Sequence, residues 1–338
     1  NGVNLMVAMM CLGKNQEDSA IINKNLIDNG YMSGYFYTYV LVKITKISIE
    51  FIRPITDEYI NKTSSNDSLL DSRGIIKLGS YVTKNTVLVS KLVFNQKENK
   101  YIDKSEIYMS NEPAIVDKIV VNYHNPHIKQ IDSVKVKLKS YRRVIEGDKI
   151  STRSGNKNII SHIMNPADLP YTKDGGEVPD IIVNPQGIPT RMCIGQLLES
   201  LFSALALCKG EIIDGTSFSK FNIDSVTEEL EKQGEDKYGL TKMINGTNGR
   251  EIEADIFYTP LYIQHIMKFS IDEMYVIDND RGPVDEITRQ PREGRQNQGG
   301  LRLGEMEKDA LASHGTTLCI KNKFIDSSDK SQQYYCKT

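Results

Sequence analysis

The chain has 338 residues, of which 39% are hydrophobic and 25% are charged, and its formal net charge is −2. This composition is ordinary for a soluble protein and leaves room for two or more modules. A net charge so close to zero gives no global signature of nucleic-acid binding. Any contact with nucleic acid must therefore come from a local patch.

The cysteines and the apolar segments exclude further classes of protein. The five cysteines form no C-x-x-C pair, which is typical of a protein from a reducing compartment. No apolar run approaches the roughly 20 residues that span a bilayer, so we expect no membrane partner. Residues 3–12 are apolar but lack the basic segment that precedes the core of a signal peptide. Because the chain begins without Met, we expect it to be a fragment of a longer protein.

Residues 1–33 are apolar and surround the polar segment KNQEDS (14–19). Within that segment, Glu17 and Asp18 are adjacent carboxylates with apolar sequence on both sides. Such a pair can supply ligands to a divalent cation or to its water molecules. A loop that provides a helix N-cap would explain the same residues, and the sequence pattern leaves both interpretations open.

Residues 34–145 are rich in Val, Ile, Tyr and Thr, and apolar and polar residues often alternate. An alternating pattern of β-branched and aromatic residues predicts strands. We therefore expect a β-rich module here. The predicted strands are 41–52, 82–93, 117–123 and 134–141.

The segment GDKISTRSGNKN (147–158) places Lys149 and Lys157 eight residues apart, with Arg153 between them. Its glycines suit bends and close approach of the backbone to a ligand. The segment is not a P-loop, because Asn158 follows the second lysine and the required glycine spacing is absent. Phosphate contact and a solvated charged face both remain open interpretations.

Helical spacing appears further along the chain. Apolar residues that follow a Pro–Thr pair and end at Gly210 predict a long helix over 184–210. Asp224 is a suitable N-cap for a second helix. An Asn–Gly pair between β-prone flanks predicts a hairpin. The elements expected after residue 210 are a helix over 224–234, the hairpin over 242–253, a helix over 261–274 and a last helix over 304–324.

Arginines mark two further candidate sites. Arg191 lies where the long helix is expected to begin, which suits an anion site but also fits a surface arginine that packs its stem. The segment 288–309 has spaced arginines, flexible glycines and no apolar periodicity. It suits contact with a phosphate backbone, although a solvated linker is the alternative. The arginines of this second candidate site are Arg289, Arg292, Arg295 and Arg302.

Four stretches, in this order, resemble one family: the second-largest (β-type) subunit of multisubunit DNA-directed RNA polymerases. The last of them resembles the eukaryotic, archaeal and large-DNA-virus branch more than the bacterial one. Asn158 departs from the family pattern, which has Gly after the second lysine. The four stretches are GKNQEDSAIIN (13–23), GDKISTRSGNKN (147–158), VPDIIVNPQGIPTRM (178–192) and TRQPREGRQNQGGLRLGEMEKDALASHG (288–315).

The resemblance implies a multidomain α+β fold with a double-psi β-barrel core. Residues 1–33 and 144–297 would form a discontinuous hybrid-binding domain. Residues 34–143 would form the wall (flap) inserted into that domain. Residues 298–325 would form the helical anchor, and residues 326–338 the start of a truncated clamp.

The resemblance also implies roles for individual residues in nucleotidyl transfer with two Mg²⁺ ions. Glu17 and Asp18 match acids near the second Mg²⁺, acting through water. Lys149 and Lys157 match lysines that contact the RNA 3′ end and the active-site phosphates. Arg191 matches a residue that contacts the phosphates of the incoming nucleotide. Nucleic-acid contacts are expected from Arg153, Arg289, Arg292, Arg295 and Arg302.

Partners and cofactors follow from the same resemblance. The expected partners are the largest and other polymerase subunits, template DNA, the RNA transcript and nucleoside triphosphates. Cys336 matches a first zinc ligand of the clamp, but the site is incomplete, so Zn²⁺ is expected only in the full-length clamp. The expected location is the nucleus for a cellular enzyme, or the cytoplasm, viral factory or virion for a large DNA virus. The alternatives are a non-catalytic nucleic-acid-binding polymerase paralogue and a single-chain, RNA-dependent polymerase with the same core.

Overall fold

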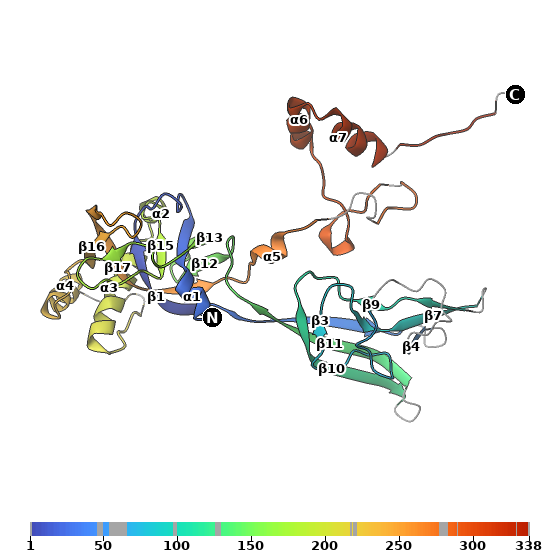
Figure 1. Ribbon diagram of the computed structural model, residues 1–338, viewed down its shortest axis with the longest axis horizontal. Helices are drawn as coiled ribbons and strands as arrows, with labels where there is room; N and C mark the ends of the chain where they lie inside the picture. The colour runs from blue at the N-terminus through green and yellow to red at the C-terminus, as the bar shows by residue number, and fades with distance from the viewer. Residues whose placement is uncertain are drawn as a thin grey trace. The chain divides into compact units, whose positions relative to one another are not determined.

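A computed structural model describes residues 2–45, 50–53, 66–96, 100–125, 130–216, 218, 222–276, 283–288, 290–328 and 330–336. The chain is a sheet-rich, mixed α/β protein (Figure 1). It divides into two compact units, Asn1–Ile266 and Met267–Thr338.

The first unit contains every strand named among the described residues, together with four helices. The strands are β1 (Gly2–Met9), β2 (Ser19–Asn23), β3 (Gly34–Lys43), β4 (Glu50–Ile52), β5 (Tyr81–Val82), β6 (Val87–Val89), β7 (Lys91–Asn95), β8 (Lys100–Asp103), β9 (Glu106–Ile107), β10 (Ala114–Asn125), β11 (Gln130–Arg142), β12 (Lys149–Thr152), β13 (Lys157–Met164), β14 (Tyr171–Thr172), β15 (Ile181–Val183), β16 (Leu240–Ile244) and β17 (Glu251–His265). The helices are α1 (Lys24–Asp28), α2 (Gly187–Arg191), α3 (Ile194–Lys209) and α4 (Ile223–Lys232).

Six strands of the first unit pair into a closed ring. β1 pairs with β15 and β17, β17 with β12, β12 with β13, β13 with β2, and β2 with β15. The pairs β1–β15 and β2–β13 are parallel, and the other four are antiparallel. β16 extends the sheet from β17, and β14 follows β16. Because the ring is closed, each of the six strands pairs with a neighbouring strand on both of its sides.

Side chains from the ring strands pack into two hydrophobic clusters. Leu5, Val7 and Met9 of β1 join residues from the five other ring strands in one cluster, which therefore fills the inside of the ring. Alternate residues, such as Ala8 and Ile21, belong to a second cluster with residues of β16. Successive side chains of a strand point to opposite faces, so β1, β2 and β15 are buried on both sides. Their near-continuous apolar sequences follow from this double burial.

Residues 34–142 form a β-rich module with its own hydrophobic core. A four-stranded sheet in the order β3-β11-β10-β5 carries it, and Gly34–Lys43 pairs with Ser133–Arg142 in a continuous antiparallel register. One face of the sheet supplies Val134, Val136 and Leu138 to the core. The chain enters and leaves the module through β3 and β11, which lie side by side (Figure 1). The predicted β-rich module is thus confirmed, although 82–93 forms parts of three short strands instead of one.

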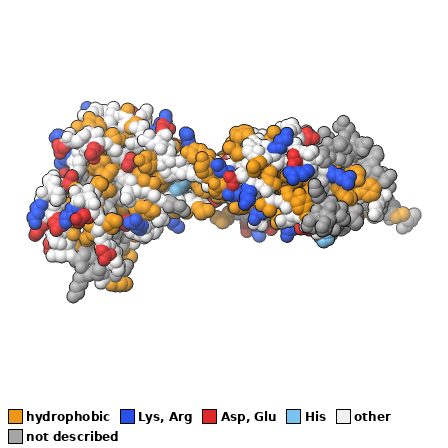
Figure 2. Space-filling model, turned by 90° about the horizontal axis from the view of Figure 1, so that it is seen from below, with side chains coloured by type: hydrophobic (Ala, Val, Ile, Leu, Met, Phe, Trp, Pro, Cys, Tyr) orange, Lys and Arg blue, Asp and Glu red, His pale blue; other side chains and the backbone are white. Residues whose placement is uncertain are grey.

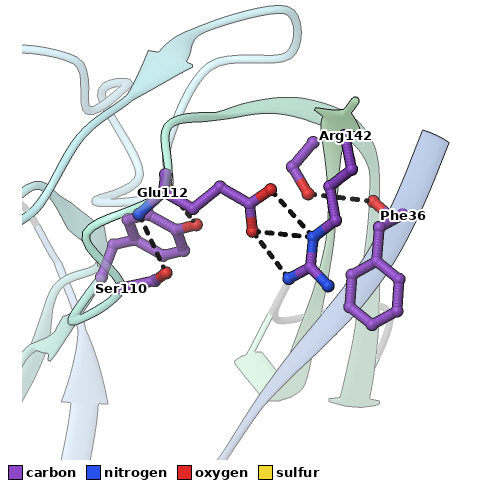
Figure 3. Close-up of polar contacts among 6 residues, drawn as sticks. Phe36, Ser110, Glu112 and Arg142 are labelled. Atoms are coloured by element: carbon purple, nitrogen blue, oxygen red, sulfur yellow. Dashed lines mark hydrogen bonds and ion pairs between the residues drawn. The ribbon is translucent and has the colours of Figure 1, made fainter. Parts of the chain in front are cut away.

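A partly buried ion pair fixes the end of β11 (Figure 3). Arg142 donates through Nε and Nη2 to both carboxylate oxygens of Glu112, at 2.8–3.1 Å. The guanidinium also lies over the ring of Phe36, 4.0 Å from its centroid. The main-chain N–H of Glu112 donates to Ser110 Oγ at 3.1 Å. These contacts join the β3–β11 pair to the loop that precedes β10.

The helices of the first unit differ from the predicted ones in their starting points. The segment predicted as one helix over 184–210 forms two, because Met192 adopts a left-handed φ of 54° between α2 and α3. Gly210 ends α3 in the left-handed conformation, as predicted. The N-cap of α4 is Asn222, whose side chain accepts from the N–H of Asp224, so the prediction of Asp224 as the cap is wrong.

The predicted helix over 261–274 is wrong. Residues up to His265 belong to β17, and only Ser270–Glu273 is helical (α5). Leu261 and Ile263 are buried, whereas Tyr262 and Gln264 are less so, which is the two-residue period of a strand. The predicted hairpin is confirmed by β16 and β17, with β17 much longer than expected.

The second unit is largely helical and irregular among its described residues. The predicted helix over 304–324 is broken where Gly315 takes a left-handed φ of 82°. Across the described parts of the whole chain, no helix is long and apolar enough to cross a membrane. The elements of the second unit are α5 (Ser270–Glu273), a 3₁₀ turn η1 (Arg295–Asn297), α6 (Glu305–His314), α7 (Thr317–Lys321) and a π turn η2 (Asn322–Asp326).

Candidate functional site

Lys149 and Lys157 lie on the same face of the β12–β13 hairpin. In the antiparallel register Lys149 is opposite Ile159, and Ser151 is opposite Lys157. Residues that are opposite each other, or two apart on one strand, share a face. The two lysines are therefore diagonal neighbours, roughly 7–8 Å apart at this position of a sheet. Lys157 is exposed and Lys149 is partly buried.

The turn of this hairpin explains the glycine between the lysines. Gly155 has a φ of +78°, which an L-residue rarely adopts, and its N–H donates to the carbonyl of Thr152 at 3.2 Å. The N–H of Thr152 donates to the carbonyl of Asn156 at 3.0 Å. Asn158 occupies an extended strand position and is buried, so the chain accommodates a side chain where the family pattern has Gly.

Arg153, at the tip of the hairpin, is held by protein groups. Its Nη1 lies 3.3 Å from Glu199 Oε1 of α3, and its guanidinium lies 4.2 Å from the ring centroid of Tyr262. Burial raises the pKa of the Glu199 carboxyl, and Arg153 opposes that rise. Since more than half of the Arg153 side chain is still exposed, its contact with nucleic acid stays a prediction.

The loop with Glu17 and Asp18 packs directly against this hairpin. The carbonyl of Asp18 accepts from the N–H of Ile159 at 2.9 Å and from Asn158 Nδ2 at 3.3 Å. Glu17 has a left-handed φ of 53° and an exposed side chain. Helix α1 is capped by Asn23, so Asp18 is not its N-cap. The loop therefore places two carboxylates beside the strand that carries Lys157.

Arg191 connects this loop to the hairpin turn. Its guanidinium forms an ion pair with Asp18 through Nη2 and donates through Nη1 to Asn156 Oδ1 at 2.7 Å. Asn156 in turn donates to Gln196 Oε1 of α3 at 3.2 Å. The hydrogen bond to Asp18 raises the pKa of Arg191. Arg191 lies in the last turn of the five-residue helix α2, just before the long helix α3 as predicted, and not in the first turn of α3.

Three segments that are distant in the sequence thus converge at one place on the ring. They bring together two lysines, one arginine and two carboxylates, with Asn156 and Gln196 as buried polar supports. These supports were not predicted from the sequence, because a buried Asn or Gln has no recognisable spacing. Cations next to carboxylates at a partly exposed surface suit binding of phosphate groups together with a divalent cation.

The fit of a metal ion to these residues is limited. Asp18 is already paired with Arg191, and Glu17 is exposed. The described residues contain no group of three or more His, Cys, Asp or Glu side chains that could hold a metal ion. Glu17 and Asp18 can therefore act on a divalent cation through water or as part of a ligand set completed by another chain. Cys336 is exposed and belongs to no such group among those residues.

The second unit contains a separate group of basic side chains. A cavity of about 640 Å³ is lined by Arg292, Arg302 and Lys323 among other residues. Arg295 does not line it; this side chain donates to the carbonyl of Asp272 and lies 5.8 Å from the ring centroid of Tyr275. Arg289 lies outside the described residues. Lys323 was not predicted, because it lies 21 residues after Arg302, the last arginine of that segment.

Acidic and basic side chains are interspersed over the surface visible in Figure 2, in line with the near-zero net charge. The cations of the site are therefore a local concentration at the ring and not part of a global field.

Comparison with known proteins identifies the family. A family model described as RNA polymerase Rpb2, domain 6, matches residues 1–297, and the model for domain 7 matches residues 299–338. The chain belongs to the RNA polymerase Rpb2 family. The resemblance expected from the four sequence stretches is thereby confirmed.

Relatives of this Rpb2-family chain come from eukaryotes and from large DNA viruses. A DNA-directed RNA polymerase II subunit RPB2 of Encephalitozoon cuniculi is 35% identical over 99% of this chain and 30% of its own length. A polymerase II subunit 2 of Arabidopsis thaliana is 34% identical over 99% of this chain and 29% of its own. A subunit 2 of Acanthamoeba polyphaga mimivirus is 35% identical over 95% of this chain and 27% of its own. The chain thus spans less than a third of the length of these relatives.

Proposed function

We propose that this chain is part of the second-largest subunit of a DNA-directed RNA polymerase and supplies cationic contacts at the site of nucleotide addition. The observation that carries the proposal is the convergence of Lys149, Lys157, Asp18 and Arg191 from three distant segments. The matching relatives are named as DNA-directed RNA polymerase subunits, which supports the same activity.

The chemistry of nucleotidyl transfer requires what this site contains. Charge accumulates on the phosphate oxygens during the reaction, so positioned cations lower the barrier. Lys149 and Lys157 would contact phosphates at the RNA 3′ end, because lysine provides a compact charge on a mobile stem. Arg191 would contact the phosphates of the incoming nucleotide, since its planar guanidinium can donate two parallel hydrogen bonds.

The ion pair with Asp18 also affects how Arg191 would bind a nucleotide. The ion pair holds the guanidinium at the edge of the site before a nucleotide enters. A nucleotide phosphate would have to compete with the Asp18 carboxylate for the same donors. When bound, Mg²⁺ would supply charge neutralisation at the phosphates, with Glu17 and Asp18 as its nearest acids in this chain.

The ring of six strands supports a finer assignment of the fold. We assign it as the double-psi β-barrel of the hybrid-binding domain, formed by 1–33 and 144–297. Residues 34–143 would then be the wall, residues 298–325 the anchor and residues 326–338 the start of the clamp. Arg153, Arg292, Arg295 and Arg302 would contact the nucleic acid by charge, as would Arg289.

The assembled enzyme would include the largest subunit and other polymerase subunits, and would bind template DNA, RNA and nucleoside triphosphates. Zn²⁺ would bind in the full-length clamp. The location would be the nucleus for a cellular enzyme, or the cytoplasm, viral factory or virion for the enzyme of a large DNA virus; relatives of both origins are consistent with either.

The test is nucleotide addition by polymerase reconstituted with the full-length subunit. We expect Lys149→Ala and Lys157→Ala each to slow addition by roughly a hundred- to a thousandfold, the usual cost of a lost donor to developing charge. Single-turnover extension of a labelled RNA primer on a DNA template measures this rate directly. Each variant should still assemble with the other subunits.

The matched control is Lys173→Ala. Lys173 lies outside the ring strands, and its Nζ is 2.8 Å from Glu251 at the surface. This control should extend the primer at the wild-type rate. Wild-type rates in the Lys149 and Lys157 variants would favour the alternative of a non-catalytic, nucleic-acid-binding paralogue.

A further inference from the structure

His265 is the last residue of β17 and lies against two acceptor atoms. Its Nδ1 is 3.1 Å from the carbonyl oxygen of Met32, and its Nε2 is 3.2 Å from Asp148 Oδ2. The side chain of Asp148 is 1% exposed and that of His265 is 11% exposed. A carboxylate buried to this extent is costly without a partner that donates to it.

The two acceptors lie against the two nitrogens of the imidazole ring. A carbonyl oxygen can only accept, so Nδ1 carries a hydrogen directed at Met32. Nε2 lies within ion-pair distance of Asp148 Oδ2, at 3.2 Å. The pair joins β17 to the residue that precedes Lys149.

The His265–Asp148 pair lies where three segments of the chain come together. Met32 precedes β3, through which the chain enters the inserted module, and Asp148 follows the return from that module. Ile266 begins the departure toward the second unit, and its N–H donates to the carbonyl of Lys149 at 3.0 Å. Asp148 Oδ2 also accepts from the N–H of Ile145 at 3.2 Å, which closes the loop before β12.

The backbone of Asp148 continues this network into β13. Its carbonyl accepts from the N–H of Ile160 at 3.0 Å, and the N–H of Gly147 donates to the carbonyl of Ile160 at 2.8 Å. The start of β12 is therefore fixed on one side by β13 and on the other by His265, the last residue of β17, and by Ile266, which follows it. Lys149 is the first residue of β12, so its position depends on both sides.

We propose that His265 and Asp148 are positioning residues that hold Lys149 in place for nucleotide addition. The inference rests on the proposed function of Lys149. His265 acts through the backbone of Lys149 and does not contact the substrate. Removing the pair would leave the lysine present but displaced, and displacements of about 1 Å can cost roughly a hundredfold in rate.

The experiment is a double-mutant cycle in polymerase reconstituted with the full-length subunit. His265→Leu removes both polar contacts of the ring, and Asp148→Asn removes the charge while keeping the shape. We expect each to slow single-turnover addition by roughly ten- to a hundredfold in the wild-type background. In a Lys149→Ala background neither should slow it further, because the group that they position is gone.

A rescue variant separates positioning from folding. Arginine carries several donors and a permanent charge, so His265→Arg can serve both the Met32 carbonyl and the Asp148 carboxylate. We expect it to restore addition to within a fewfold of the wild type. His124→Leu, which replaces an exposed histidine of β10, is the matched control and should have no effect.

Other outcomes distinguish the two proposals. Equal losses from His265→Leu in the wild-type and Lys149→Ala backgrounds would show a general structural role and overturn the inference. Wild-type rates in both His265→Leu and Asp148→Asn would overturn it as well. If Lys149→Ala itself has no effect, the proposed function of Lys149 fails first. If the His265→Leu subunit does not assemble, the double-mutant cycle is made with Asp148→Asn and Lys149→Ala instead.

Discussion

Asn156 is the residue on which the geometry of the site depends most directly. It is buried, and it accepts from Arg191 while donating to Gln196, so it relays the position of α3 to the guanidinium. Asp18 alone would leave Arg191 free to swing about a single ion pair. With Asn156 in place, two groups at an angle restrain the planar guanidinium, which is what directional contact with a phosphate requires.

We expect Asn156→Ala to raise the KM for nucleoside triphosphates several-fold with a smaller change in kcat. The reason is that Arg191 remains charged but loses one of its two restraints. The variant also leaves the buried Gln196 oxygen without this donor, which should lower the free energy of unfolding by about 1–3 kcal/mol. Steady-state extension assays measure the first effect, with Asn248→Ala in the exposed β16–β17 turn as control. If the KM equals that of the control, the restraint of Arg191 by Asn156 does not contribute to nucleotide binding, and the prediction is contradicted.

At the scale of elements, the inserted module is joined to its own loops by the Glu112–Arg142 pair (Figure 3). Both side chains are nearly buried, at 13% and 10% exposure. Removing one partner of a buried pair leaves an uncompensated charge and typically costs about 3–5 kcal/mol. We therefore expect Arg142→Ala to destabilise the β3–β11 end of the module by that amount.

Chemical denaturation with a probe in the module measures this loss. Arg142→Lys should recover only part of it, because lysine cannot donate in a bidentate manner. The control is Arg73→Ala, whose pair with Asp71 has a side-chain exposure of 57% for the arginine. Exposed pairs contribute about 0–1 kcal/mol, so a loss in Arg142→Ala no larger than this would contradict the prediction.

Glu50 makes the stability of the same module depend on pH in the acid range. Burial would raise the pKa of this carboxyl, but hydrogen bonds from Lys91 and Thr45 lower it from 4.5 to about 2. Because the pKa in the folded state lies below that of the unfolded chain, the stabilisation is complete above pH 4.5. It is lost as the pH falls from there toward about 2.

We expect Glu50→Gln to be less stable than the wild type at neutral pH and to converge with it as the pH approaches 2. Urea unfolding at a series of pH values tests this. If the difference in unfolding free energy between the two proteins stays constant across the acid range, Glu50 is not the source of the pH dependence of stability.

At the scale of the whole molecule, the proposed chemistry needs more metal ligands than the described residues of the site offer. Two-metal transfer fixes two ions against the attacking and leaving oxygens. Of the acids at the site, Asp18 is paired with Arg191 and Glu17 is exposed. We therefore expect residues 1–338 alone to give no templated RNA synthesis with Mg²⁺ and all four nucleotides.

Primer extension with and without the largest subunit is the measurement. Addition of the partner to the full-length subunit should restore synthesis. Extension by residues 1–338 alone, abolished by Glu17→Ala with Asp18→Ala, would place a complete active site within this chain and contradict the proposal.

The sequence by itself determined the family and the identity of the charged residues, because both reside in local motifs. Glu17–Asp18 and Lys149–Lys157 are recognisable from neighbouring residues without knowledge of the fold. It also determined the β-rich character of residues 34–142, since alternation within a strand is a local property.

The tertiary structure decided which of these residues meet. The end of β17 was predicted as a helix because Leu261 and Ile263 lie among other apolar residues, and only pairing with β1 and β12 makes it a strand. Asn156, Gln196 and His265 acquire their roles from contacts with residues at least 35 positions away in the sequence. Local spacing cannot report such contacts, because closure of the ring brings together side chains whose sequence separation carries no periodic signal.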